Sequence, residues 1–192
     1  EIFFTSGGTE SNNLAIRGYL NANPRKGKYI ITTRIEHPSV LEVCKYLESK
    51  GYEVDYLDID KCGILDVEML KSKIREDTSL ISIMAVNNET GAIQPLEEIV
   101  KIKNQVKRDV VIHTDAVQAY GKIEILPAKT GIDMITMSSH KINGPKGVGA
   151  LYVRRGVRIM PVIFGGGQES LMRSGTENVP GICGFGLSSQ IT

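Results

Sequence analysis

The sequence has no tryptophan, and only 6% of its 192 residues are aromatic. Its three cysteines, Cys44, Cys62 and Cys183, are odd in number and widely separated, so they form neither a disulfide framework nor a zinc-binding pattern. No apolar run approaches the roughly 18 residues that a membrane span needs. The formal net charge of +1 gives no electrostatic case for nucleic acid or membrane as a partner. These features favour a globular protein of a reducing, cytoplasmic compartment.

Short strand-like runs recur along the chain. They are rich in Ile, Val, Thr and Tyr, as buried strands are. They cover residues 2–5, 29–33, 53–57, 80–86, 110–114, 134–137 and 150–153. The connection between the last two runs is short and rich in glycine. It is too short for a helical crossover, so this pair is predicted to be antiparallel.

Amphipathic stretches lie between the strand-like runs. Apolar residues at three- and four-residue spacing predict helices over residues 9–20, 39–50, 67–74 and 95–106. The alternation indicates an α/β fold with a mostly parallel sheet and helices on both faces. Beyond residue 155 the alternation of strand and helix patterns is no longer evident, so residues 156–192 are expected to be irregular.

Polar clusters follow several of the predicted strands, where open α/β sheets bind their ligands. The first cluster joins the strand 2–5 to the helix that follows it. Gly7 and Gly8 allow the backbone to approach a ligand closely, and Thr9 can cap the helix. The segment therefore has the properties of an anion site, although a tight turn with a cap accounts for it equally well.

A lysine, a histidine and two hydroxyls follow the strand 134–137. The amine of Lys141 could condense with an aldehyde cofactor such as pyridoxal 5'-phosphate (PLP), while Ser138 and His140 hold a phosphate. Asp115 follows another strand, where its carboxylate could pair with a pyridine nitrogen. The alternatives are a solvated basic loop for the first segment and a helix cap for Asp115.

Two further strand ends carry ring-binding or turn-forming residues. Asn88 lies in an Asn-Asn-Glu-Thr-Gly segment whose amides could contact a phenolic oxygen or simply form a turn. His37 follows the strand 29–33 and could stack on a ring, shuttle protons or be structural. His113 is not expected to enter the site, since it alternates with the residues next to Asp115.

Assembled in order, these segments resemble the cysteine desulfurases, PLP enzymes of the class V aminotransferase family. The resemblance runs nearly end to end. Its motifs lie at residues 5–13, 36–37, 86–91, 115–118, 138–141 and 173–176. The Ser-His-Lys segment, the following Gly-Pro-Lys-Gly and the Arg-Ser-Gly-Thr run are similar to the group that serves iron–sulfur cluster and thio-cofactor assembly.

The resemblance implies the large domain of a fold-type I PLP-dependent transferase. The implied reaction converts L-cysteine to L-alanine and passes sulfur to an enzyme persulfide. The implied partners are a second copy of the chain, in a homodimer, and a sulfur acceptor or iron–sulfur scaffold protein. No metal site is expected. Another class V enzyme, such as a selenocysteine lyase or an aminotransferase, remains an alternative. A non-catalytic scaffold that docks a sulfur-transfer partner is another.

The resemblance also implies a role for each site residue. Lys141 forms the Schiff base with PLP and moves protons, Asp115 pairs with the pyridine nitrogen, and His37 stacks over the ring and acts in acid–base steps. The remaining roles are phenolic-oxygen contacts from Asn88 and Gln118, phosphate contacts from Gly8, Thr9, Ser138 and His140, and a contact from Thr176 to the phosphate of the neighbouring subunit.

One feature departs from the family pattern. The family's nucleophilic cysteine and its substrate-carboxylate arginine lie beyond the Arg-Ser-Gly-Thr run, after the last residue of this sequence. The family's opening segment is missing as well. Residues 1–192 are therefore expected to form the PLP-binding large domain of a longer enzyme, with little or no activity alone.

Overall fold

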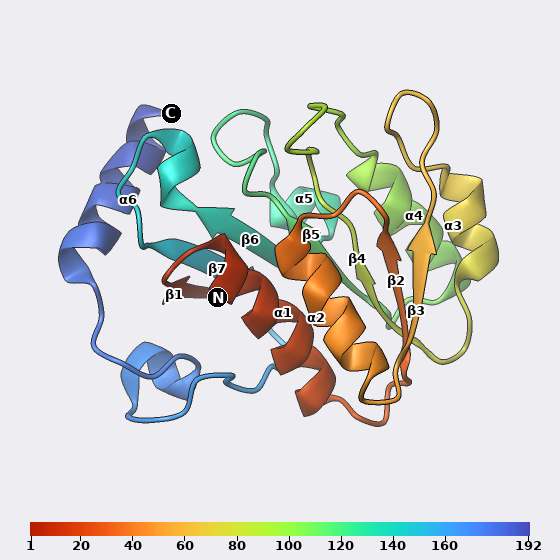
Figure 1. Ribbon diagram of the computed structural model, residues 1–192, viewed down its shortest axis with the longest axis horizontal. Helices are drawn as coiled ribbons and strands as arrows, with labels where there is room; N and C mark the ends of the chain where they lie inside the picture. The colour runs from red at the N-terminus through yellow and green to blue at the C-terminus, as the bar shows by residue number, and fades with distance from the viewer.

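The computed structural model describes residues 1–192 and contains one seven-stranded sheet. Its strands follow the order β1-β7-β6-β5-β4-β2-β3 across the sheet (Figure 1). Their bounds are β1 Ile2–Thr5, β2 Tyr29–Thr33, β3 Glu53–Leu57, β4 Thr78–Ser82, β5 Val111–Asp115, β6 Met134–Ser138 and β7 Gly149–Val153.

The strands β2 to β6 pair in parallel, as the predicted helical crossovers require. β7 is antiparallel to both β6 and β1, which places β1 at the sheet edge. The antiparallel pairing of β6 with β7 confirms the prediction from their short connection. The parallel pairing of β2 to β6 confirms the predicted, mostly parallel α/β fold.

Helices cover both faces of the sheet. Their bounds are α1 Gly8–Ala22, α2 Pro38–Glu48, α3 Val67–Lys73, α4 Leu96–Val106, α5 Pro127–Thr130 and α6 Val179–Ile191, with 3-10 helices η1 Ser139–Ile142 and η2 Gln168–Leu171. α1 and α2 lie side by side on one face (Figure 1), and α3 and α4 pack together on the other. No helix combines the length and the apolar character that crossing a membrane requires.

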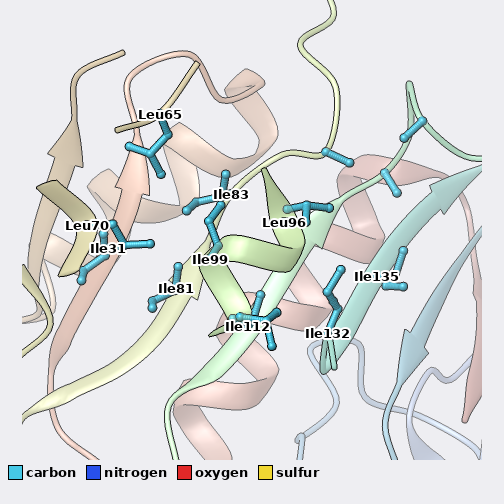
Figure 2. Packing of buried hydrophobic residues seen from close by; sticks show 14 of the residues in the cluster. Ile31, Leu65, Leu70, Ile81, Ile83, Leu96, Ile99, Ile112, Ile132 and Ile135 are labelled. Atoms are coloured by element: carbon cyan, nitrogen blue, oxygen red, sulfur yellow. The ribbon is translucent and has the colours of Figure 1, made fainter. Parts of the chain in front are cut away.

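Two hydrophobic cores flank the sheet because neighbouring residues of a strand point to opposite faces. Ile30 and Leu80 belong to the core under α1 and α2, whereas Ile31 and Ile81 belong to the core under α3 and α4. Figure 2 shows the second core, in which Ile99 of α4 faces isoleucines of several strands. Burial on both faces explains why these strands read as continuous apolar runs in the sequence.

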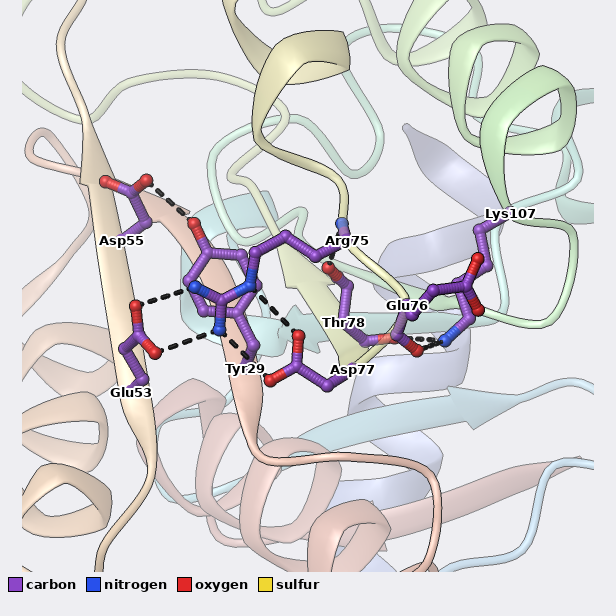
Figure 3. A network of polar contacts seen from close by, with 8 residues as sticks. All are labelled: Tyr29, Glu53, Asp55, Arg75, Glu76, Asp77, Thr78 and Lys107. Carbon is purple, nitrogen blue, oxygen red and sulfur yellow. Dashed lines mark hydrogen bonds and ion pairs between the residues drawn. The ribbon is translucent and has the colours of Figure 1, made fainter.

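The amino ends of β2, β3 and β4 meet in a network of exposed ion pairs (Figure 3). Arg75 donates to both oxygens of Glu53, at 2.8 and 2.9 Å, and to Asp77. Its guanidinium carbon lies 3.5 Å from the ring centroid of Tyr29, whose hydroxyl donates to Asp55. The network joins the starts of neighbouring strands, and the charges of Arg75, Glu53 and Asp77 pair with one another.

Two predicted elements differ from the structure. The strand predicted over 80–86 ends at Ser82, because the backbone N–H of Met84 donates to the side chain of Glu36 instead of to β2. Residues 156–192 were expected to be irregular but contain η2 and the 13-residue helix α6. α6 is rich in glycine and apolar on all sides, so it lacks the amphipathic stripe that predicts a helix. It packs against η1, at the end of the molecule that carries β1 and β7 (Figure 1).

Candidate cofactor-binding site

A cavity of about 330 Å³ lies at the carboxyl ends of the central strands. It brings together every predicted site residue except Thr176. Those that line it are Gly8, Thr9, His37, Asn88, Asp115, Gln118, Ser138, His140 and Lys141. Segments that are far apart in the sequence thus meet at the carboxyl ends of the strands.

The N-terminus of α1 forms one wall of the cavity. Gly7 precedes the helix in a conformation, φ 153°, that favours glycine, and no side chain caps the helix. The prediction that Thr9 caps it is wrong, because Thr9 is already the second helical residue. A Cβ atom on Gly8 would lie 2.7 Å from Cγ2 of Val117, so any side chain there would force this part of the cavity wall to shift. The uncapped N–H groups are suited to an anion.

Ser138 and His140 add polar groups beside this helix end. Ser138 is the last residue of β6, and its hydroxyl lies 2.9 Å from Nδ1 of His140. Loss of solvent lowers the pKa of His140, and the nearby charges of Lys141 and Lys146 lower it further. A neutral His140 can donate one ring N–H to an anion while its other nitrogen contacts Ser138.

Lys141 follows in η1, the single helical turn that begins directly after β6. The turn ends at Asn143 in the left-handed conformation, φ 62°. No hydrogen bond or ion pair within the chain uses the amine of Lys141, although the residue lines the cavity. An unpaired amine in a cavity is the arrangement that condensation with an aldehyde requires.

Asp115 ends β5 and is 5% exposed. Asn12 donates to its Oδ2 at 2.7 Å, and the backbone N–H of Val117 donates to its Oδ1 at 2.9 Å. Burial raises the pKa of Asp115, whereas these two hydrogen bonds oppose the rise by favouring the carboxylate. The contact with Val117 shows that Asp115 also stabilises the turn that follows β5, whereas the alternative interpretation, a helix cap, is wrong because no helix begins there.

His37 lines the cavity at the point where α2 begins. Its Nδ1 accepts a hydrogen bond of 3.1 Å from the backbone N–H of Ser39 and thereby caps α2. The Ser39 hydroxyl lies 2.8 Å from the same nitrogen. The imidazole is thus held by its Nδ1 side, while the residue lines the cavity that Asp115 and Lys141 share.

Asn88 and Gln118 complete the rim. The turn that carries Asn88 is organised by its buried neighbour Asn87, whose Oδ1 accepts from the backbone N–H groups of Glu89 and Thr90. Asn87 also donates to the carbonyl of Ile35, which ties this turn to the segment before His37. Asn88 therefore fits both interpretations, since it lies in a turn and also lines the cavity.

Glu36, beside His37, is a buried residue that sequence reasoning did not single out as a site residue by itself. Its Oε1 accepts from Thr33 Oγ1 and from the backbone N–H of Met84, each at 2.8 Å. Its Oε2 is buried without a partner. Burial raises the pKa of Glu36 to about 8, so the side chain is largely protonated at neutral pH. The carboxyl group joins the end of β2 to Met84, which lines the cavity.

His113 lies outside the cavity, as predicted. It is fully buried in β5, where Nδ1 contacts the hydroxyl of Ser82 at 2.8 Å and Nε2 contacts that of Thr136 at 3.0 Å. Burial lowers its pKa to about 3. His113 is therefore a neutral residue that links β4 to β6 through the sheet.

Thr176 lies away from the cavity, in a smaller hollow of about 90 Å³ beside Thr5 and Ser6. Arg173 fixes this segment by pairing with Glu10 of α1 at 2.8 Å. Glu10 also accepts from the backbone and the hydroxyl of Ser6. The Arg-Ser-Gly-Thr run is thus attached to the first turn of α1, and the contact of Thr176 with a neighbouring subunit remains a prediction.

The cavity also contains residues that sequence reasoning did not select as ligand contacts. The additional lining residues are Ser39, Met84, Val86 and Val117. Asn12 supports the cavity from within α1 and is 0% exposed. The only sequence signal for Asn12 was its membership in the Thr-Glu-Ser-Asn motif. None of the three cysteines lines the cavity, since Cys44 is buried elsewhere and Cys62 and Cys183 are exposed.

Sequence comparison places the whole chain among related proteins. The model of the family "Aminotransferase class-V" matches residues 1–191. "Cysteine desulfurase IscS 1" of Archaeoglobus fulgidus is 53% identical over 192 residues, which are 100% of this chain and 50% of that protein. "Cysteine desulfurase IscS" of Methanosarcina thermophila is 52% identical over 191 residues and is covered to 47%. The chain spans about half the length of these curated relatives.

Solved structures agree with this result. A "NIFS-LIKE PROTEIN" superposes with a TM-score of 0.97 at 47% identity, over 100% of this chain and 52% of that one. A second structure, described as "SspA in complex with cysteine", has a TM-score of 0.93 at 42% identity, over 98% of this chain and 55% of that one.

Proposed function

This chain belongs to the class V aminotransferase family, and on that premise we propose that it is the PLP-binding part of a cysteine desulfurase. The parent enzyme converts L-cysteine to L-alanine and transfers the sulfur to one of its own cysteines as a persulfide. The observation that carries the proposal is the single cavity shared by the unpaired amine of Lys141, the buried carboxylate of Asp115 and the uncapped end of α1.

The chemistry of the cavity fits PLP at each of its functional groups. The N-terminus of α1, with Ser138 and His140, provides donors for a phosphate. Asp115 provides a carboxylate for a protonated pyridine nitrogen, and Lys141 provides the amine for covalent attachment. Bound PLP supplies an electron sink for substrate carbanions.

The protein side chains have separable tasks. Asn88 and Gln118 provide amides for the phenolic oxygen, and His37 provides a ring face and a proton-carrying nitrogen. With the cofactor bound, the amine of Lys141 would be the group of this chain that can take and return protons. Asp115, held by two donors, would accept a hydrogen bond from the pyridine nitrogen.

The nucleophile for sulfur comes from outside residues 1–192 in this proposal. The support is that no cysteine of the chain lines the cavity. The names of the relatives, IscS and NifS-like, favour delivery of sulfur to iron–sulfur cluster or thio-cofactor assembly. A homodimer, in which Thr176 reaches the partner's phosphate site, and a sulfur-acceptor protein belong to the same proposal, as does a cytoplasmic location.

The test uses the full-length protein incubated with PLP. The wild type should show a visible absorbance band that borohydride removes, and it should produce alanine from L-cysteine. Lys141→Ala should lose both properties. The matched control is Lys146→Ala, a lysine of the same loop that does not line the cavity. A colourless wild type, or a Lys141→Ala variant that keeps its activity, would contradict the proposal. Selenocysteine and amino acid/keto acid pairs, assayed in parallel, separate desulfuration from other class V activities.

A further inference from the structure

Two residues that the proposed chemistry does not use, Asn12 and Ser39, connect His37 to Asp115. Asn12 lies on α1, and its Nδ2 is 2.7 Å from Asp115 Oδ2 and 2.8 Å from Ser39 Oγ. Ser39 Oγ is in turn 2.8 Å from His37 Nδ1, the nitrogen to which the Ser39 backbone N–H also donates. Both linking residues are buried, at 0% and 9% exposure. A continuous path of hydrogen bonds therefore joins two walls of the cavity.

The two ends of this path determine the direction of every hydrogen bond in it. Both oxygens of Asp115 accept, so the amide of Asn12 must turn its NH₂ group toward the carboxylate. The second hydrogen of that NH₂ group points to Ser39 Oγ, which leaves the hydroxyl hydrogen of Ser39 for His37 Nδ1. The backbone N–H of Ser39 can only donate and contacts the same nitrogen. His37 Nδ1 is consequently an acceptor.

The opposite orientation of Asn12 is excluded by the same contacts. If its amide were flipped, Oδ1 would face Asp115 Oδ2 at hydrogen-bond distance with no hydrogen between the two oxygens. In the orientation observed, Oδ1 is buried without a partner. The lost hydrogen bond of this oxygen is the consequence of turning the NH₂ group toward Asp115 and Ser39.

We propose that Asn12 and Ser39 are positioning residues, which hold the His37 ring as the neutral tautomer with its hydrogen on Nε2. No group of the chain contacts Nε2, so this N–H is the only polar group of the ring available to a molecule in the cavity. The tautomer follows from protein contacts alone. Its value for proton transfer rests on the proposed function.

The first measurement is ¹⁵N NMR of the full-length protein labelled at histidine, with the His37 signals assigned by their loss in His37→Gln. The expected spectrum shows His37 Nδ1 at the shift of an unprotonated ring nitrogen and Nε2 at the shift of a protonated one. A spectrum with the hydrogen on Nδ1, or with equal populations of both neutral tautomers, overturns the proposal.

The second measurement compares two variants. Ser39→Ala removes the hydroxyl donor to His37 Nδ1, whereas Asn12→Ala removes the donors to Ser39 Oγ and to Asp115. Both variants should move the His37 ¹⁵N signals toward a mixture of tautomers. Both should also lower kcat by about three- to tenfold, the effect of one neutral hydrogen bond, with a smaller change in KM. Asn12→Ala should in addition weaken PLP binding. If Asn12→Ala does not fold, Ser39→Ala alone decides.

The matched control is Ser79→Ala, which removes a buried hydroxyl that has no hydrogen-bond partner and does not line the cavity. It should leave the His37 signals and kcat unchanged. If Ser39→Ala behaves like Ser79→Ala, the positioning role is refuted. A protein that shows the Nε2 tautomer but neither binds PLP nor desulfurates L-cysteine contradicts the proposed function and leaves the hydrogen-bond path intact.

Discussion

The two ends of the parallel strands carry very different polar groups. At the amino ends, the exposed charges of Arg75, Glu53 and Asp77 pair with one another (Figure 3). At the carboxyl ends, Lys141 has no partner within the chain, and Glu36 keeps a buried oxygen unpaired. Lys141 and Glu36 thus each keep a polar group without a protein partner at the end of the sheet where the cavity lies.

The difference has a physical cause in the fold. Each crossover helix on the carboxyl side starts near the end of a strand, so its free N–H groups and its positive dipole face the sheet edge. Polar residues there meet from several strands at once. At the amino ends, helices finish and the chain is free to place ion pairs in solvent, where each pair contributes little.

The largest expected effect is that of Asp115→Ala in the full-length enzyme. Loss of the buried carboxylate that the pyridine nitrogen requires should lower kcat/KM for L-cysteine by about 10²–10³-fold, as for other preorganised electrostatic groups. The comparison variant at the amino end is Asp77→Ala, which should leave kcat/KM unchanged. Steady-state assays of alanine production measure both. Equal losses in the two variants would remove the distinction between the two strand ends.

The next largest effect is expected on stability, from Glu36→Ala. It leaves the backbone N–H of Met84 and the hydroxyl of Thr33 buried without their acceptor, which should lower the free energy of unfolding by about 1–3 kcal/mol. Glu36→Gln keeps an acceptor oxygen and should be much less damaging. Urea unfolding at pH 6 compares the two. Similar losses of unfolding free energy in both variants would show that stability does not depend on the hydrogen bonds that Oε1 accepts.

The same carboxyl group should make stability depend on pH. Its pKa is about 8 in the folded protein and 4.5 as an ordinary value, so between these limits the folded state holds a proton that the unfolded chain has released. The free energy of unfolding should therefore fall as pH rises from 4.5 to 8. In Glu36→Gln this contribution should vanish. Urea titrations of both proteins across this range measure the difference, and parallel pH profiles would contradict the assignment.

The smallest effect is expected from Arg75→Gln, although this residue makes more ion-pair contacts than any residue of the cavity. Its partners are exposed and screened by solvent. Activity should not change, and the urea midpoint should shift less than in Glu36→Ala. The shift should shrink further at high salt, since screening weakens exposed pairs. A shift that exceeds that of Glu36→Ala would reverse the comparison.

Local patterns in the sequence predicted much of the fold and most of the cavity. Apolar spacing predicted α1 to α4, and strand composition predicted all seven strands. The patterns failed where tertiary contacts decided the outcome. β4 ends early because Met84 bonds to Glu36, and α6 is helical although it has no amphipathic stripe. The prediction of a Thr9 cap is wrong because the sequence does not distinguish the N-cap from the first helical residues.

The sequence by itself determined the α/β class, the family and the residue types at the strand ends, since these depend on local spacing and on motifs. Only the tertiary structure decided that Asn12 faces Asp115, that Ser39 contacts His37 and that Glu36 is buried with a raised pKa. The physical reason is that hydrogen-bond direction and desolvation depend on which distant segments meet. In this chain, α1, α2 and β5 meet only when the sheet forms.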